Sequence, residues 1–145
     1  KKKKKKSNNI NKIKLPFRAT CNNFILKDDS KIRKLVFYKD YYDVFIKNQR
    51  SRVQAKIFWT IILIENVEKV PSKYLKYIIG SNGVFEIRIL TRNDIFRIFC
   101  FFNKQNELVL INGFQKKTQK TPQNEIDKAL KIKHDYENEK EYHHP

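Results

Sequence analysis

Two arginines stand in segments of the sequence that otherwise have the character of β-strands. Arg88 lies in "VFEIRIL" (84–90), where apolar and polar residues alternate and Arg88 shares the polar face with Glu86. Arg97 lies in "IFRIFCFF" (95–102), which is apolar on both faces apart from this one residue. A guanidinium in such a strand is costly unless an anion or hydrogen bonds compensate it. Arg97 therefore predicts either a partly buried ion pair with Glu86 or an anionic ligand.

Three lysines follow the next apolar run. The segment "GFQKKTQKTP" (113–122) contains Lys116, Lys117 and Lys120. A solvated charge run beside a helix is the commonest structure for such a segment. Adjacent antiparallel strands could instead bring these lysines and the two arginines to one concave end of a sheet. Converging cations of that kind suit a phosphodiester, because they bind it and stabilise the extra negative charge of its transition state.

The segments that would position these cations alternate in type along the chain. The pattern predicts a strand at 34–39, helices at 40–49 and 51–70, a turn region at 72–83, strands at 84–90, 95–102 and 107–114, and a last helix at 122–139. The short polar connectors between the last three strands favour hairpins. The order β-α-α-β-β-β-α predicts an α+β domain, with one antiparallel-rich sheet packed against helices.

Short polar residues precede the predicted helices. Asp40, Ser51 and Thr121 are candidate N-caps, Pro122 suits a first helical position, and Pro71 is expected to end the second helix. Apolar residues at helical spacing predict the buried faces: Val53, Ile57, Ile61 and Ile64 in the second helix, and Ile126, Ala129 and Leu130 in the last.

Composition and charge limit the class of protein. The chain has 145 residues, enough for one domain with a core, and 40% of them are hydrophobic, including eleven Phe, seven Tyr and one Trp. The formal net charge is +17, which favours a polyanionic partner such as nucleic acid, the ribosome or an anionic membrane. Residues 1–33 hold twelve cations against two acids, and the rest hold twenty against thirteen, so the two parts carry +10 and +7.

The chain divides near residue 32. Residues 1–32 are rich in Lys, Asn and Ile and have neither a helical nor a strand period. This leader could be a basic arm that binds phosphates. We expect it to be disordered or not part of the native protein, because Lys, Asn and Ile share A/T-only codons, so an AT-rich leader read in frame would have this composition. The absence of methionine from the chain adds to this expectation. Residues 33–138 then form the domain, and residues 139–145 a polar tail.

Other features of the sequence point away from metals and membranes. Cys100 is expected to be a buried, reduced thiol, and with the isolated Cys21 it favours a cytoplasmic location over secretion. His134, His143 and His144 have no cysteine or carboxylate cluster at ligand spacing, so we expect no metal site. No apolar run is long enough to span a membrane, and no signal peptide is evident.

The sequence of the sheet resembles that of a known toxin family. "GVFEIRI", "DIFRIFCFF" and "LVLINGFQKKTQKTPQNEIDKALKIKHDY", with the preceding β-α-α, resemble the HigB branch of the RelE/ParE toxin superfamily of type II toxin–antitoxin systems. The resemblance covers about residues 33–138, and "GFQKKTQKTP" is its most specific part. It implies a RelE-like fold.

The resemblance also implies an activity. Such toxins enter the ribosomal A site and cleave the mRNA codon presented there, without a metal ion or other cofactor. The RNA 2′-OH attacks the adjacent phosphate and leaves a 2′,3′-cyclic phosphate. By motif, the resemblance assigns Arg97 and Lys116 to phosphate and transition-state charge and Arg88 to orienting the scissile phosphate. It assigns Lys117, Thr118 and Lys120 to RNA binding.

The resemblance leaves proton transfer open. Several RelE-type toxins use a tyrosine or histidine near the C-terminus as general acid or base, and this chain offers His134 and Tyr136. Both lie far along the last helix, where we expect surface residues rather than catalytic ones. A lysine whose pKa is lowered by neighbouring cations could serve as the base instead.

Two other functions compete with RNA cleavage. The superfamily also contains ParE-like gyrase poisons, and the same charges could belong to a non-catalytic basic RNA-binding module. If the chain is a toxin, its implied partners are the ribosome, mRNA and a cognate helix-turn-helix antitoxin of the HigA type.

Overall fold

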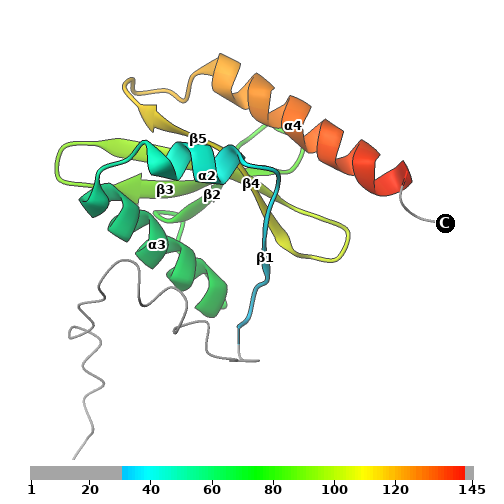
Figure 1. Cartoon of the computed structure of the whole chain (residues 1–145), viewed down its shortest axis with the longest axis horizontal. Helices are drawn as coiled ribbons and strands as arrows, with labels where there is room; N and C mark the ends of the chain where they lie inside the picture. Colours follow the sequence, from blue (N-terminus) through cyan, green and yellow to red (C-terminus); the bar gives the residue numbers. More distant parts are fainter. Residues whose placement is uncertain (1–30, 143–145) are drawn as a thin grey trace, which may run out of the picture.

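A five-stranded sheet with helices on both faces forms the described part of the chain, residues 31–142 of the computed structural model (Figure 1). Its elements are β1 (Leu35–Phe37), α2 (Tyr41–Lys47), α3 (Ser51–Asn66), β2 (Leu75–Tyr77), β3 (Val84–Leu90), β4 (Ile95–Phe102), β5 (Leu108–Lys116) and α4 (Gln123–Tyr142). The expected basic leader at 1–32 lies outside the described residues except for its last two positions.

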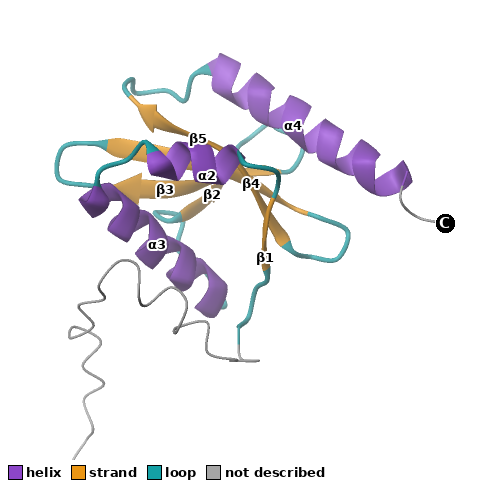
Figure 2. Ribbon diagram, in the orientation of Figure 1, coloured by secondary structure: helices purple, strands orange, loops and turns teal. Residues whose placement is uncertain are grey.

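The strands lie in the order β1-β5-β4-β3-β2 (Figure 2). β1 runs parallel to β5, and every other neighbouring pair is antiparallel. The predicted α+β class, with an antiparallel-rich sheet packed against helices, is confirmed, and the arrangement fits a RelE-like fold.

One short strand was not predicted. β2 lies within the segment expected to be a turn region, and it pairs antiparallel with β3, with Leu75 opposite Ile87. Only Leu75 of its three residues packs against the core, while Lys76 and Tyr77 are exposed. An alternation this short carries no strand signal, so the strand depends on the free edge that β3 offers.

The two faces of the sheet carry separate cores. α2 and α3 cover one face, and α4 covers the other (Figure 1). The four residues predicted to form the buried face of α3 are all buried: Val53, Ile57, Ile61 and Ile64. On the other face Ala129 is buried, and Ile126 and Leu130 pack beside it, as predicted. The sheet is therefore the middle layer of a three-layer domain.

α3 ends earlier than predicted. It stops at Asn66, five positions before Pro71, because Val67 takes an extended conformation (φ −103°, ψ 125°). The guanidinium of Arg33 donates hydrogen bonds to the carbonyls of Ile64, Val67 (3.1 Å) and Glu68 (2.9 Å). A side chain distant in sequence thus satisfies carbonyl groups that a helix end leaves without partners.

The predicted caps take other roles. Asp40 stands at the N-cap of α2 but makes no side-chain capping bond, and Ser51 is the first helical residue of α3 rather than its cap. Thr121 donates its hydroxyl to Glu86 Oε2 at 3.4 Å, and the backbone carbonyl of Pro122 accepts the first bonds of α4. α4 continues to Tyr142, four residues into the segment expected to be a polar tail.

β5 contains a bulge. Ile98 of β4 pairs with Gly113, whereas Cys100 pairs with Leu110, which leaves one extra residue of β5 opposite Phe99. Such a bulge reverses the alternation of side chains between the two faces of a strand.

The bulge decides which face carries the end of β5. Ile111 before the bulge and Phe114 after it both pack in the core on the α4 side. By continued alternation Lys116 lies on that side as well. Gly113 faces α2, where a Cβ would lie 2.5 Å from the Phe45 ring. Glycine is therefore required where α2 crosses the bulge.

No helix in the stretch 31–142 is long and apolar enough to span a membrane.

Replacing Arg33 with alanine tests how the start of the domain is attached. Arg33→Ala should lower the free energy of unfolding by about 1–3 kcal/mol, because charged hydrogen bonds to three carbonyls are lost. Lys31→Ala is the matched control, since the Lys31–Glu65 ion pair (3.1 Å) is exposed on the lysine side and should contribute less than about 0.5 kcal/mol. Urea denaturation measures both changes, and equal losses would contradict the capping role.

Candidate functional site

Cations from three strands gather on the α4 side of the sheet. Arg88 of β3 pairs directly with Arg97 of β4. Arg97 in turn pairs with Phe114 of β5, and Lys116 follows two residues later, opposite Ile95. Side chains of directly paired residues share a face, so the three predicted cations lie together at one end of the sheet.

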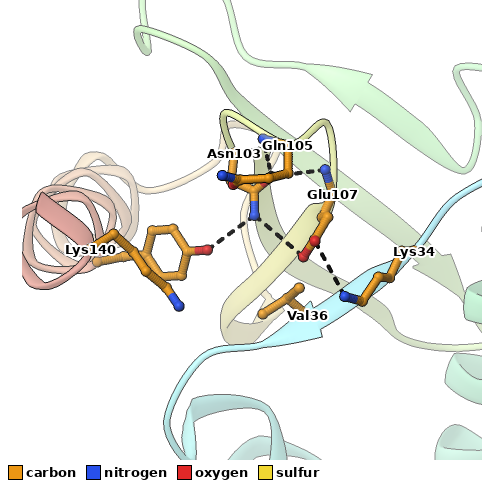
Figure 3. Close-up of a pocket in the computed structure, with 7 residues that line it drawn as sticks. Lys34, Val36, Asn103, Gln105, Glu107 and Lys140 are labelled. Atoms are coloured by element: carbon orange, nitrogen blue, oxygen red, sulfur yellow. Dashed lines mark hydrogen bonds and ion pairs between the residues drawn. The ribbon is translucent and has the colours of Figure 1, made fainter. Parts of the chain in front are cut away.

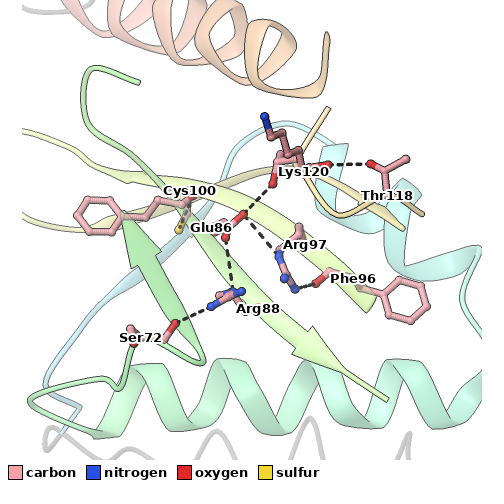
Figure 4. A network of polar contacts seen from close by, with 10 residues as sticks. Ser72, Glu86, Arg88, Phe96, Arg97, Cys100, Thr118 and Lys120 are labelled. Atoms are coloured by element: carbon pink, nitrogen blue, oxygen red, sulfur yellow. Dashed lines mark hydrogen bonds and ion pairs between the residues drawn. The ribbon is translucent and has the colours of Figure 1, made fainter. Parts of the chain in front are cut away.

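A buried carboxylate lies between the two arginines. Glu86 Oε1 is 3.5 Å from Arg88 Nε, and its Oε2 is 3.5 Å from Arg97 Nε (Figure 4). Glu86 is 7% exposed, and Thr121, just before α4, approaches the same Oε2 at 3.4 Å. The predicted ion pair between Glu86 and Arg97 is therefore present, and Glu86 holds both guanidiniums in place.

The two arginines differ in their access to solvent. Arg97 is only 4% exposed, and its Nη1 donates to the carbonyl of Phe96 at 3.0 Å. Burial lowers the pKa of Arg97, while the adjacent Glu86 carboxylate opposes that shift. Arg88 has a half-buried side chain, and its Nη1 lies 3.4 Å from the carbonyl of Ser72. A ligand at this surface would therefore reach Arg88 more readily than Arg97.

Lys116 is half-buried beside these charges. Its pKa is lowered, first by partial burial and then by the positive charge of Arg97, and Arg88 and Lys76 add to the effect while Glu86 opposes it. The lysine with a lowered pKa that the sequence suggested as a possible base is thus Lys116. Neutral lysine is the form that can accept a proton.

Sequence reasoning missed Lys76. This lysine is the central residue of β2 and pairs with Glu86, so it faces the same side of the sheet. Its strand was not predicted, and nothing in the segment around it marked it as a neighbour of the arginines. We refer to Lys76, Arg88, Arg97, Lys116 and Glu86 as the cation cluster; four positive charges and one negative charge give it a net charge of +3.

The remaining predicted RNA-binding residues lie in the loop between β5 and α4. Lys117, Thr118 and Lys120 are all exposed. The Thr118 hydroxyl donates to the carbonyl of Lys120 at 2.7 Å, a bond that closes a turn within the loop (Figure 4). The loop directly follows Lys116, so its two lysines extend the positive surface beyond the cation cluster.

The two C-terminal candidates for proton transfer lie away from the cluster. His134 is exposed on α4, as expected, and its Nε2 lies 3.1 Å from Asn138 Nδ2. Tyr136 was expected at the surface but is 5% exposed, because it packs edge-on against Tyr38 and Phe101 in the α4-side core. The structure brings neither residue to the cation cluster.

A polar hollow occupies the other end of the sheet, where the β4–β5 turn meets β1 and α4 (Figure 3). Asn103 Nδ2 donates to the Tyr136 hydroxyl at 3.1 Å and lies 3.5 Å from Glu107 Oε2. Glu107 also pairs with Lys34 at 3.3 Å. The polar side chains that line the hollow thus bind one another, which is typical of a structural contact rather than a ligand site.

Metal-binding and thiol chemistry find no support in residues 31–142. No group of three or more His, Cys, Asp or Glu side chains in that range could hold a metal ion. Cys100 is buried as predicted, and burial raises the pKa of its thiol. An inert, protonated thiol follows from that environment.

A double-mutant cycle tests the buried ion pair. Glu86→Gln should lower the free energy of unfolding by about 3 kcal/mol, since it leaves the buried Arg97 without its carboxylate. Arg97→Met should cost less, because Glu86 keeps its ion pair with Arg88. The double variant should lose at least about 1 kcal/mol less than the sum of the two. The control is a double-mutant cycle on Lys34 and Glu107, in which the Lys34 side chain is 74% exposed. Its coupling energy, measured by the same denaturation, should be near zero.

Comparison with known proteins identifies a family. The model of the family described as phage derived protein Gp49-like (DUF891) matches residues 44–134, more than half of the chain. The matched range runs from α2 to α4 and includes every residue of the cation cluster. No curated protein matches the chain.

Proposed function

The chain belongs to the Gp49-like family of phage-derived proteins, within the RelE/HigB-type toxin superfamily, and from this premise we propose that it cleaves mRNA on the ribosome. It is then the toxin of a type II toxin–antitoxin system, a metal-independent endoribonuclease that cuts codons in the A site. The observation that carries the proposal is the convergence of Arg88, Arg97 and Lys116 from three strands onto one face of the sheet.

RNA supplies its own nucleophile for this reaction. The 2′-oxygen attacks the adjacent phosphorus and gives up its proton, and the 5′-oxygen of the next nucleotide leaves and takes a proton. The products are a 2′,3′-cyclic phosphate and a 5′-hydroxyl. A protein therefore needs only to orient the phosphate, stabilise the added negative charge and move protons, and a cluster with a net charge of +3 suits the second task.

We assign different tasks to the three cations on the basis of their burial. Arg88 and Lys116 are half-buried and would contact the scissile phosphate directly. Arg97 is 4% exposed, so it would act mainly through its fixed positive charge and through Glu86, which it holds against Arg88. Glu86 is then a positioning residue. Lys117, Thr118 and Lys120 would bind the RNA on the side of the β5–α4 loop.

Lys116 also suits the proton transfer that the two C-terminal residues do not reach. Partial burial and Arg97 both favour its neutral form. A neutral Lys116 would take the proton of the 2′-OH and, once charged, would stabilise the phosphorane. One residue would thus supply both base and charge.

A free nuclease of this kind would stop translation in its host. The toxin family implies an antitoxin partner, and we propose a helix-turn-helix protein of the HigA type encoded next to the toxin. The positive cation cluster makes an acidic segment of that partner electrostatically favourable, with association slowed by salt.

Replacing Lys116 tests the nuclease directly. Lys116→Ala should lower cleavage by about 100- to 1000-fold, comparable to removal of one transition-state donor, with an unchanged circular-dichroism spectrum. Primer extension on mRNA during translation measures it. Lys104→Ala, in an exposed turn at the opposite end of the sheet, should cleave like the wild type. DNA breaks through gyrase would indicate a ParE-like poison instead. If neither mRNA nor DNA is cut, the remaining interpretation is a non-catalytic RNA-binding module.

The pH dependence of cleavage separates the two roles of Lys116. If neutral Lys116 is the base, the rate should rise with pH and level off below the ordinary lysine pKa of 10.5, because the pKa of Lys116 is lowered. If Lys116 acts only as a cation, the rate should instead fall as pH rises through the same pKa. Single-turnover cleavage between about pH 6 and pH 9 measures the slope, and Lys116→Arg, which stays charged, should lose any rise.

A further inference from the structure

Two aromatic rings and two lysines form a patch where α3 meets the segment before β2. The rings of Trp59 and Tyr74 lie 5.6 Å apart at 67° to each other. The Lys56 amine lies 4.6 Å from the centre of the Trp59 ring, and the Lys73 amine lies 4.8 Å from that of Tyr74. We refer to these four residues as the aromatic–lysine patch.

The patch is more exposed than the core requires. Trp59 is the only tryptophan of the chain, and 44% of it is exposed, although large aromatic side chains are usually well buried. Within residues 31–142, no carboxylate lies within ion-pair distance of Lys56 or Lys73. Both amines therefore stay available to an anion while they rest on the rings.

The patch lies on the α3 side of the sheet, and the edge strand β2 separates it from the cation cluster on the α4 side. The backbone N–H of Arg88 donates to the carbonyl of Tyr74 at 2.8 Å, and Arg88 Nη1 lies 3.4 Å from the carbonyl of Ser72 (Figure 4). Arg88, a member of the cluster, is thus hydrogen-bonded through its backbone to the backbone of Tyr74, whose ring belongs to the patch. A single strand of nucleic acid held at Arg88 would reach Tyr74 and Trp59 by passing around the edge formed by β2.

We propose that the aromatic–lysine patch binds single-stranded RNA, with a base stacked on Trp59 and phosphates held by Lys56 and Lys73. The proposal rests on the proposed cleavage of mRNA and extends it, because the patch would hold the nucleotides that flank the scissile phosphate. Exposed rings beside cations are the combination that binds single strands without sequence preference. The amines would move from the ring faces to the phosphates as a base takes their place.

Charge favours RNA over a protein as the occupant. On the surface of α3, the neighbours of Trp59 one turn away are Lys56 and Ile62, and Arg52 lies two turns before it. None of these helix neighbours is acidic. Ile62 is the apolar neighbour that a docking protein would cover, and it is 43% exposed. Around the Trp59 ring there are more cations than exposed apolar side chains, and the cations complement the negative charge of phosphates.

The single tryptophan makes the test specific. The full chain is titrated with a single-stranded RNA whose 2′-oxygens are methylated, so that cleavage cannot occur, and Trp59 fluorescence is followed. Stacking should quench Trp59 and protect it from acrylamide. Inorganic polyphosphate of equal charge should bind the lysines of the chain without that protection, since it has no bases.

Variants give the affinity of the patch by anisotropy of the labelled RNA. Trp59→Ala should weaken binding by about 5- to 150-fold, the range for loss of one stacked base. Trp59→Phe should recover part of that loss, because it restores an aromatic face. Tyr142→Ala, which removes an 89% exposed ring at the far end of α4, should bind like the wild type.

Three results would overturn the patch as an RNA site. They are RNA binding without a change in Trp59 fluorescence, equal affinity of Trp59→Ala and wild type, and loss of antitoxin binding rather than RNA binding in Trp59→Ala. Cleavage by primer extension is scored separately. If Trp59 is quenched in a protein that never cuts mRNA, the nuclease proposal is contradicted and the patch proposal is supported. If mRNA is cut but Trp59 is not quenched, the patch proposal is contradicted and the nuclease proposal is supported.

Discussion

The bulge in β5 is the constraint on which the candidate site depends. Strict alternation from Ile111 would turn Lys116 toward α2 and α3, away from the two arginines. The extra residue opposite Phe99 reverses the alternation and brings Lys116 to the face of Arg88 and Arg97. Gly113 makes this possible, because the Phe45 ring of α2 lies where any Cβ at that position would be. The packing of a helix on one face thus sets the charge arrangement on the other.

Glu86 reduces the charge of the cluster and at the same time orders it. Arg88 and Arg97 are directly paired neighbours of like charge on adjacent strands, and without this carboxylate they would repel each other. With it, both guanidiniums are held at 3.5 Å from one buried acid, and the site still carries an excess of positive charge. Replacement of buried ion pairs by apolar residues is often neutral or stabilising, so the network is better explained by placement of the arginines than by stability.

Much of the fold follows from local patterns in the sequence. The buried face of α3, the three long strands and their hairpin connections are confirmed, because periods of several turns or several strand residues are strong signals. The early end of α3 could not be predicted, since Arg33, more than thirty positions away, satisfies its last carbonyls. At the site, the ion pair between Glu86 and Arg97 was predictable because the two residues lie on neighbouring strands. The bulge had a signal as well, because a glycine inside a strand, here Gly113, often marks one.

The strand that the sequence did not reveal connects the two surfaces of the molecule. β2 pairs with β3 as its one strand neighbour, its central residue Lys76 lies opposite Glu86, and Tyr74, just before the strand, packs on Trp59. Both placements depend on one register, Leu75 opposite Ile87, which the α3-side core fixes by taking up Leu75. A slip of one residue would turn Lys76 into that core and remove Tyr74 from Arg88. The packing of a single leucine therefore places both Lys76 in the cation cluster and Tyr74 in the aromatic–lysine patch.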